Sequence, residues 1–105
     1  MARAMATSIV IVGVGGQGAL TLARRIGEAA LAEGYDVRIA EIHGMSQRGG
    51  SVEVHVRFGR EVYALIVEEA GADLVIALEA VEALRGFRNL KPSGVLVINK
   101  RVIAE

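Results

Sequence analysis

Residues 9–18 read IVIVGVGGQG, an apolar strand-like run that passes directly into a glycine-rich turn, and a segment of helical period follows. With so few side chains, the backbone N–H groups of such a turn can approach an anion closely. A helix that starts at Gln17 would add the positive end of its dipole at the same place. The spacing fits G-x-G-x-x-G, and a tight turn packed against a sheet satisfies that pattern equally well. The glycines of the turn are Gly13, Gly15, Gly16 and Gly18.

Composition indicates one small globular domain over residues 1–105, because 52% of the residues are hydrophobic. Twelve basic residues balance twelve acidic ones, which gives no reason to expect nucleic acid or an anionic membrane as a partner. The sequence holds no cysteine, and this excludes disulfides, a thiolate nucleophile and a cysteine-ligated iron–sulfur cluster within the chain. No apolar stretch reaches about 18 residues, so we expect a cytoplasmic protein.

Hydrophobic periodicity predicts an α/β fold. Glycine at position 34 stands where the C-terminal cap of the first helix belongs. Gly27, inside that helix, is best explained by close packing of the helix on a sheet. The expected strands are residues 8–12, 37–42, 51–58, 62–67, 72–78 and 95–99, and the expected helices are residues 17–33 and 79–87.

Two turns complete the predicted topology. A two-residue turn at residues 58–61 would fold residues 62–67 back against the strand 51–58, and residues 91–94, which read KPSG, fit a type I turn. We therefore expect a Rossmann-like three-layer sandwich whose mixed, mostly parallel sheet contains a β-hairpin.

A dinucleotide-binding (NAD or FAD) module is the obvious alternative for such a glycine turn. Glu41 stands about where a ribose-binding acid would stand. However, only eight residues, 43–50, separate the second and third expected strands, and a parallel crossover normally needs a dozen or more. The topology therefore counts against this alternative without removing it.

The connection over residues 43–50 reads HGMSQRGG and is the second feature with chemical potential. It leaves the strand ends from which the first glycine turn also leaves, so the two loops should be neighbours. Arg48 could then place a fixed cation beside the backbone amides of the first loop. An arginine that bonds local carbonyls or a carboxylate at a subunit interface is the other interpretation of the same residue.

Other polar residues indicate less. Glu53, His55 and Arg57 alternate with valines on the strand 51–58, which predicts a polar stripe that faces solvent or a partner subunit. His43 and His55 lack the additional ligands that a zinc site needs, so we expect no metal, and we interpret them as a loop hydrogen-bonding residue and a strand-surface residue.

The two glycine-bearing motifs together carry a resemblance. GVGGQG followed by HGMSQRGG resembles the gamma-type domain of the 2-oxoacid:ferredoxin oxidoreductases, and most closely the beta subunits of the indolepyruvate type. ADLVIALE at residues 72–79 and LKPSGVLVIN at residues 90–99 support the resemblance, which covers nearly the whole chain.

The resemblance implies an enzyme complex that oxidatively decarboxylates an aryl 2-oxoacid to its acyl-CoA and passes electrons to ferredoxin. It places thiamine diphosphate and iron–sulfur clusters on an alpha-type partner subunit and coenzyme A near this domain. No catalytic residue is expected in the chain, which would be inactive by itself and would act as a CoA-proximal or a pure assembly domain. The motif residues that it carries over are Gly13, Gly15, Gly16, Gln17, Gly18, Arg48, Gly49 and Gly50.

The chain departs from the resembled family in two places. The family domain normally continues beyond the strand that ends at Asn99, whereas this sequence stops at Glu105. We therefore expect apolar edge or face surface that a second half, a partner or a homodimer would cover. Relatives often carry Ser-Pro where this chain has Ala64 and Leu65, so the geometry of that segment is not predicted.

Overall fold

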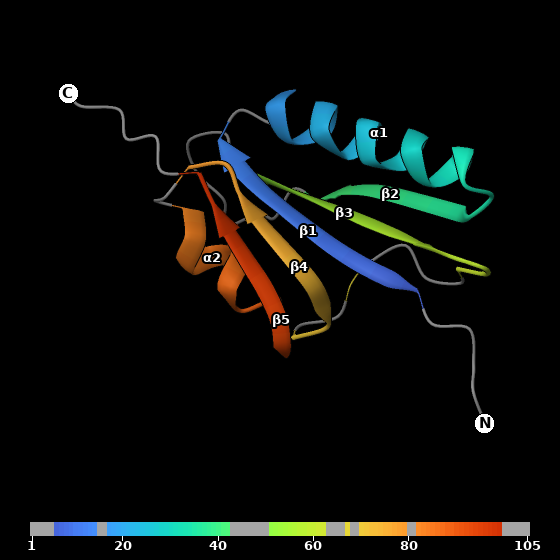
Figure 1. Ribbon diagram of the computed structural model, residues 1–105. Helices are drawn as coiled ribbons and strands as arrows, with labels where there is room; N and C mark the ends of the chain where they lie inside the picture. Colours follow the sequence, from blue (N-terminus) through green and yellow to red (C-terminus); the bar gives the residue numbers. More distant parts are fainter. Residues whose placement is uncertain are drawn as a thin grey trace.

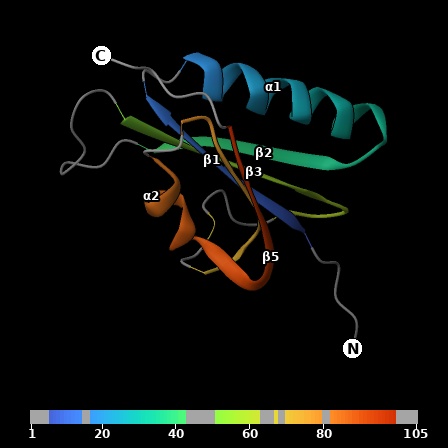
Figure 2. The same ribbon diagram turned by 60° about the vertical axis from the view of Figure 1, so that its left-hand side comes forward.

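A computed structural model describes residues 6–14, 17–42, 51–62, 67, 70–79 and 82–99. Its five strands form one sheet with a helix on each face, as Figures 1 and 2 show. The elements in chain order are β1 (Thr7–Val14), α1 (Gln17–Ala32), β2 (Asp36–Ile42), β3 (Ser51–Gly59), β4 (Ala72–Ala77), α2 (Ala83–Phe87) and β5 (Leu90–Ile98). The expected α/β architecture with a mixed sheet is confirmed. None of the helices in this described part of the chain is long and apolar enough to cross a membrane.

The sheet has the order β2-β3-β1-β4-β5. β1 is parallel to β4, and β4 to β5, whereas β3 is antiparallel to both of its neighbours, β1 and β2. β3 is an internal strand of the sheet, and its side chains are buried on both faces from Val52 to Val56. The sheet is therefore mostly parallel, with one reversed strand between β2 and β1.

The hairpin lies at a different place from the one predicted. β3 pairs with β2, across the connection 43–50, and its other edge is occupied by β1. No edge of β3 is left for residues 62–67, so the predicted pairing through the turn at residues 58–61 is wrong. Val62 and Val67 lie outside strands, and residues 63–66 lie outside the described residues.

Packing around α1 follows the sequence pattern. Ala19, Ala23 and Ala30 are buried against the sheet, and Ala19 and Ala23 join the cluster of Ile9 and Ile11. A Cβ on Gly27 would lie 3.0 Å from Ile39 Cδ1 of β2. Gly27 therefore allows the helix to approach β2 closely, as predicted.

The end of α1 is a Schellman motif at the predicted cap. Gly34 has φ +92°, its N–H donates to the carbonyl of Leu31 at 2.9 Å, and the Tyr35 N–H donates to that of Ala30 at 3.1 Å. The Tyr35 ring then lies 5.7 Å from the ring of Phe58, which attaches the helix end to β3.

Two hydrophobic cores lie on opposite faces of the sheet because successive residues of β1 point to opposite sides. Ile9 and Ile11 belong to the core under α1, and Val10 and Val12 belong to the core under α2. The sheet is thus the middle layer of three (Figure 1).

Two predicted elements near the end of the chain differ from the structure. The helix expected over residues 79–87 is helical only from Ala83 to Phe87, and residues 80 and 81 lie outside the described residues. Residues 91–94, expected as a turn, belong to β5, but they lie opposite Asp73 alone because Ala72 pairs with Leu90 and Leu74 with Val95. A Cβ on Gly94 would lie 2.9 Å from the Ala72 carbonyl oxygen, which explains the glycine in this irregular stretch.

Candidate functional site

Both glycine loops leave from the same side of the sheet, the edge that is formed by the carboxyl ends of β1 and β2. Val14, the last residue of β1, is the register partner of Ser51 at the start of β3, and Ile42 at the end of β2 is the partner of Glu53. The turn after β1 therefore starts beside the point where the connection 43–50 enters β3, and the connection itself starts one strand further away, at the end of β2. We call this edge the glycine edge.

The structure places only part of the predicted site. Gly13 ends up in β1, and Gln17 and Gly18 open α1. Gly15, Gly16, Arg48, Gly49 and Gly50 lie outside the described residues. The prediction that Arg48 stands beside the first glycine turn is thus untested by side-chain geometry.

The first and last glycines of the motif pack against one side chain. A Cβ on Gly13 would lie 3.1 Å from Leu78 Cδ1, and a Cβ on Gly18 would lie 3.4 Å from the same atom. Leu78 is held there because its N–H donates to the Val12 carbonyl at 2.9 Å. Gly13 does not have the positive φ that would demand glycine. These two glycines therefore have a packing role. The sequence did not predict that Leu78 packs against both of them.

An open pocket of about 490 Å³ borders the first turns of α1. It is lined by Gly18, Thr21, Leu22 and Arg25, which follow one another at helical spacing along one side of α1. The positive end of the α1 dipole lies at the start of this pocket, and Arg25 is an exposed cation on its wall. Together they favour an anionic ligand, or the anionic part of one, at the glycine edge. Arg25 is not among the site residues predicted from the sequence.

The glycine edge coincides with the topological switch point of the sheet. The connection from β1 to β2 carries α1 on one face, and the connection from β4 to β5 carries α2 on the other (Figures 1 and 2). The two connections run in opposite directions from the central pair β1–β4. In open α/β sheets, ligands bind outside the carboxyl ends of the strands at such a point.

Glu41 is badly placed for a dinucleotide. β3 lies between β2 and β1, so Glu41 is two strands away from the glycine turn, a separation of about 10 Å at the usual strand spacing. In a dinucleotide-binding sheet the strand with the ribose-binding acid is the direct neighbour of the first strand. The arrangement of strands therefore disfavours that alternative.

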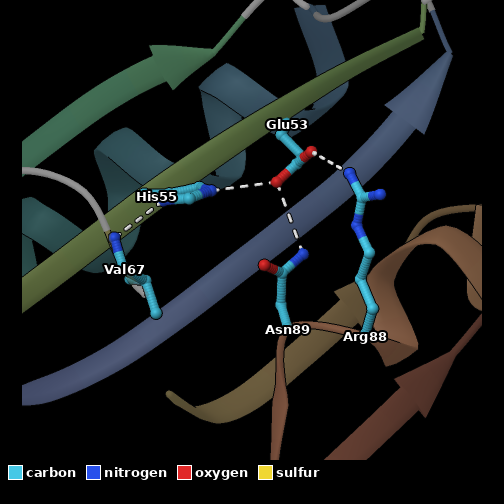
Figure 3. A network of polar contacts seen from close by, with 5 residues as sticks. All are labelled: Glu53, His55, Val67, Arg88 and Asn89. Atoms are coloured by element: carbon cyan, nitrogen blue, oxygen red, sulfur yellow. Dashed lines mark hydrogen bonds and ion pairs between the residues drawn. The ribbon is translucent and has the colours of Figure 1, made fainter. Parts of the chain in front are cut away.

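Glu53 and His55 do not form the exposed stripe that the sequence predicted. Their side chains are only 7% and 4% exposed, and they join a buried network that Figure 3 shows. His55 Nε2 lies 3.0 Å from Glu53 Oε2, and the Val67 N–H donates to His55 Nδ1 at 2.9 Å. Strict alternation predicted that β3 has two faces. It did not predict that other parts of the chain, including Val67 and Asn89, cover the polar face.

The contacts of His55 determine its tautomer. Since the Val67 amide can only donate, Nδ1 must accept, and the ring proton is on Nε2, where it is donated to the Glu53 carboxylate. Asn89 Nδ2 donates to Glu53 Oε2 at 3.4 Å, and Arg88 Nη2 lies 3.8 Å from Oε1. Both ring nitrogens of His55 are therefore occupied by structural hydrogen bonds.

Asp73 belongs to a separate polar group near the opposite edge of the sheet. Its Oδ2 accepts from the Ser8 N–H at 2.8 Å, and its Oδ1 pairs with Lys91 Nζ. Burial alone would raise the pKa of Asp73, but the hydrogen bonds from Lys91 and Ser8, together with the charges of Lys91 and Arg57, lower that pKa below its ordinary value. Arg57 Nε also donates to Ser8 Oγ at 3.1 Å, so this group joins β1, β3, β4 and β5.

The chain belongs to an oxidoreductase family: residues 8–104 match the family described as pyruvate ferredoxin/flavodoxin oxidoreductase. Among its relatives is the indolepyruvate oxidoreductase subunit IorB of Thermococcus kodakarensis, 54% identical over 96 residues that make up 91% of this chain and 48% of the relative. The chain thus spans about half the length of this and other indolepyruvate oxidoreductase subunits that it matches.

Solved structures share the fold. The gamma subunit of a keto/oxoacid ferredoxin oxidoreductase from Geobacter sulfurreducens has a TM-score of 0.71 and 24% identity, and the match covers 89% of this chain and 50% of that one. The 2-oxoglutarate:ferredoxin oxidoreductase of Magnetococcus marinus, solved with 2-oxoglutarate, coenzyme A and succinyl-CoA bound, has a TM-score of 0.72 and 21% identity over 91% of this chain and 16% of its own. At these identities the two structures establish the fold alone.

Proposed function

We propose that this chain is part of a cytoplasmic indolepyruvate ferredoxin oxidoreductase, which oxidatively decarboxylates an aryl 2-oxoacid to its acyl-CoA and reduces ferredoxin. The observation that carries the proposal is the 54% identity to IorB of Thermococcus kodakarensis over 91% of the chain. The position of both glycine loops at the switch point of the sheet supports it, since this is the edge where α/β sheets of this kind hold their ligands.

In this proposal the chain contributes binding and assembly but no redox chemistry. The sequence has no cysteine to ligate an iron–sulfur cluster. The buried histidine that could have acted as an acid or base, His55, has both ring nitrogens occupied by structural hydrogen bonds. Thiamine diphosphate and the clusters would belong to an alpha-type partner subunit, which would also deliver electrons to ferredoxin.

We further propose coenzyme A as the ligand of the glycine edge. Its phosphates suit the positive end of α1 and the cation of Arg25, and its pantetheine arm suits the largely apolar pocket beside Leu22. The protein from Magnetococcus marinus, which has this fold as part of a much longer chain, was solved with coenzyme A bound. The backbone of Gly15, Gly16, Gln17, Gly49 and Gly50 and the side chain of Arg48 would complete the site.

Reconstitution tests the activity. The chain is mixed with the thiamine-binding subunit of an archaeal indolepyruvate enzyme, and indolepyruvate-dependent reduction of ferredoxin is measured, with full-length IorB of Thermococcus kodakarensis as the positive control. A complex that forms and turns over supports the proposal. If the relative activates the partner but this chain does not, even together with the half of the relative that its match leaves out, the proposed activity is wrong.

Variants of the same complex test the ligand. Arg25→Ala and Arg48→Ala should weaken the apparent affinity for coenzyme A, whereas Arg60→Ala should not, because Arg60 is an equally exposed cation that follows β3 at the opposite edge of the sheet. Equal affinities in all three variants would remove coenzyme A from the glycine edge.

A pure assembly role is the second candidate, and the packing of Leu78 against Gly13 and Gly18 favours it. In that case the loops serve the fold only. Assembled complexes with Arg48→Ala and Arg25→Ala would then turn over at the normal rate at every coenzyme A concentration.

A further inference from the structure

An apolar surface remains open on the α1 side of β4 and β5. Leu74 and Ile76 of β4 belong to the core on that side, and their register partners on β5 are Val95 and Val97. Paired residues of parallel strands share a face, yet Val95 and Val97 are 57% and 48% exposed. We call these four residues the β4–β5 apolar face.

The sequence of β5 indicates that something covers this face. Residues 95–98 read VLVI, so β5 is apolar on both sides, which is typical of strands in parallel sheets that are covered on both faces. On the α2 side Leu96 does pack into a core. On the α1 side nothing within the described residues plays the same part, because α1 packs on β2, β3 and β1 (Figure 1).

The layer of the sandwich that contains α1 does not extend over this face within the described residues. Leu22 of α1 packs into the same core as Leu74 and Ile76, so this core extends from α1 to the β4–β5 apolar face. A helix placed over β4 and β5 would lie next to α1 in the same layer of the sandwich, as in other three-layer α/β folds. Its apolar side would rest on Val95 and Val97.

Topology limits which connection can provide that helix. α1 and α2 lie on opposite faces because both crossovers are right-handed and run in opposite directions. A crossover from β5 to a further parallel strand outside it would put its helix on the α2 side. The covering helix must therefore be the last element of its chain, or it must be followed by a segment that crosses back over the sheet toward β2.

We propose that the β4–β5 apolar face is covered by a helix from the additional polypeptide that the relatives carry. The match takes up 48% of the Thermococcus kodakarensis relative, so that protein has about as many residues again outside the part that this chain matches. That length is ample for a helix. The surface is an interface for a polypeptide and stays independent of whether the glycine edge binds coenzyme A.

Because this sequence has no cysteine, one introduced thiol reports on one position, provided that any cysteine of a fused segment is replaced by serine. Val97→Cys places a thiol on the β4–β5 apolar face, and Leu31→Cys is the matched control, since Leu31 is 60% exposed at the far end of α1. Rates of thiol alkylation are measured in the chain by itself and in the chain fused to the half of the Thermococcus kodakarensis relative that its match leaves out. Circular dichroism verifies that each variant is folded.

The proposal expects the fused half to slow alkylation at position 97 by about tenfold or more and to leave position 31 unchanged. Equal rates at position 97 in both proteins would overturn it. Protection in the chain by itself together with the mass of a dimer would assign the face to a second copy, and protection on adding coenzyme A alone would assign it to a ligand. Either result would also overturn the proposal.

Discussion

The buried pair of Glu53 and His55 makes a strong prediction about stability. In His55→Phe a planar aromatic ring of slightly larger volume remains, but the Val67 N–H loses its acceptor at 2.9 Å and the Glu53 carboxylate loses its donor at 3.0 Å. An unsatisfied buried donor costs about 1–3 kcal/mol, and a buried carboxylate that loses the N–H of a neutral histidine costs more than a neutral group would, because the carboxylate is charged.

The contacts of Glu53 with Asn89 at 3.4 Å and Arg88 at 3.8 Å soften the second cost. We therefore expect His55→Phe to lower the free energy of unfolding by about 4 kcal/mol, a large part of the roughly 5–15 kcal/mol of a typical domain.

A double-mutant cycle separates the two costs. In His55→Phe with Glu53→Leu, the stranded carboxylate is gone, and the Val67 N–H and the weakly bonded Asn89 side-chain amide lack their acceptors. The double variant should therefore be more stable than the sum of the single variants by about 2 kcal/mol. Urea unfolding followed by circular dichroism measures all four proteins.

Arg38→Ala is the control for that cycle, because it breaks an exposed ion pair with Asp36 and should cost less than about 1 kcal/mol. Additive single effects, or a loss in His55→Phe no larger than in Arg38→Ala, would refute the buried pair as described.

Three further outcomes can be measured in the same way. Gly86→Ala should lower the free energy of unfolding by about 1–3 kcal/mol, because its Cβ would lie 2.7 Å from the stiff Val75 side chain, and no loss would mean that α2 can move away from the sheet. Gly34→Ala should cost about 1 kcal/mol at φ +92°, and an unchanged urea midpoint would contradict the cap. Because the pKa of Asp73 is lowered in the fold, its charge contributes stability that is present above the ordinary pKa and lost as pH falls through the folded value. Asp73→Asn should therefore flatten the dependence of the free energy of unfolding on pH in that acid range. An unchanged dependence would show that Lys91 does not hold the carboxylate.

Local signals predicted local structure well. Helix α1 begins at Gln17 and ends at the Gly34 cap because both are determined by residues within one turn of each end. The position of strands β1 to β4 followed from apolar runs and alternation. The helix expected over residues 79–87 and the turn expected at residues 91–94 are exceptions. The helical residues Ala83–Phe87 are held by contacts with the sheet rather than by their own sequence.

The sequence did not predict correctly which strands pair with one another in the sheet. A glycine turn at residues 58–61 favours a hairpin, but both edges of β3 are occupied by β1 and β2. The polar residues of β3 were expected on a wet face for a related reason. Alternation reveals that a strand has two faces, whereas only the tertiary structure shows that Val67 and Asn89 close over Glu53 and His55.

The reversed strand explains why a glycine turn of the dinucleotide type need not bind a dinucleotide. The turn provides backbone amides and the helix end, and both depend only on β1 and α1. Recognition of a ribose needs an acid on the direct neighbour of β1, and here β3 takes that place and separates Glu41 from the turn. In the proposed site, Arg48 of the connection 43–50 would take the place of that acid. An arginine prefers an anion to a sugar hydroxyl, so the proposal expects the glycine edge to favour the phosphate groups over the nucleoside part of a ligand.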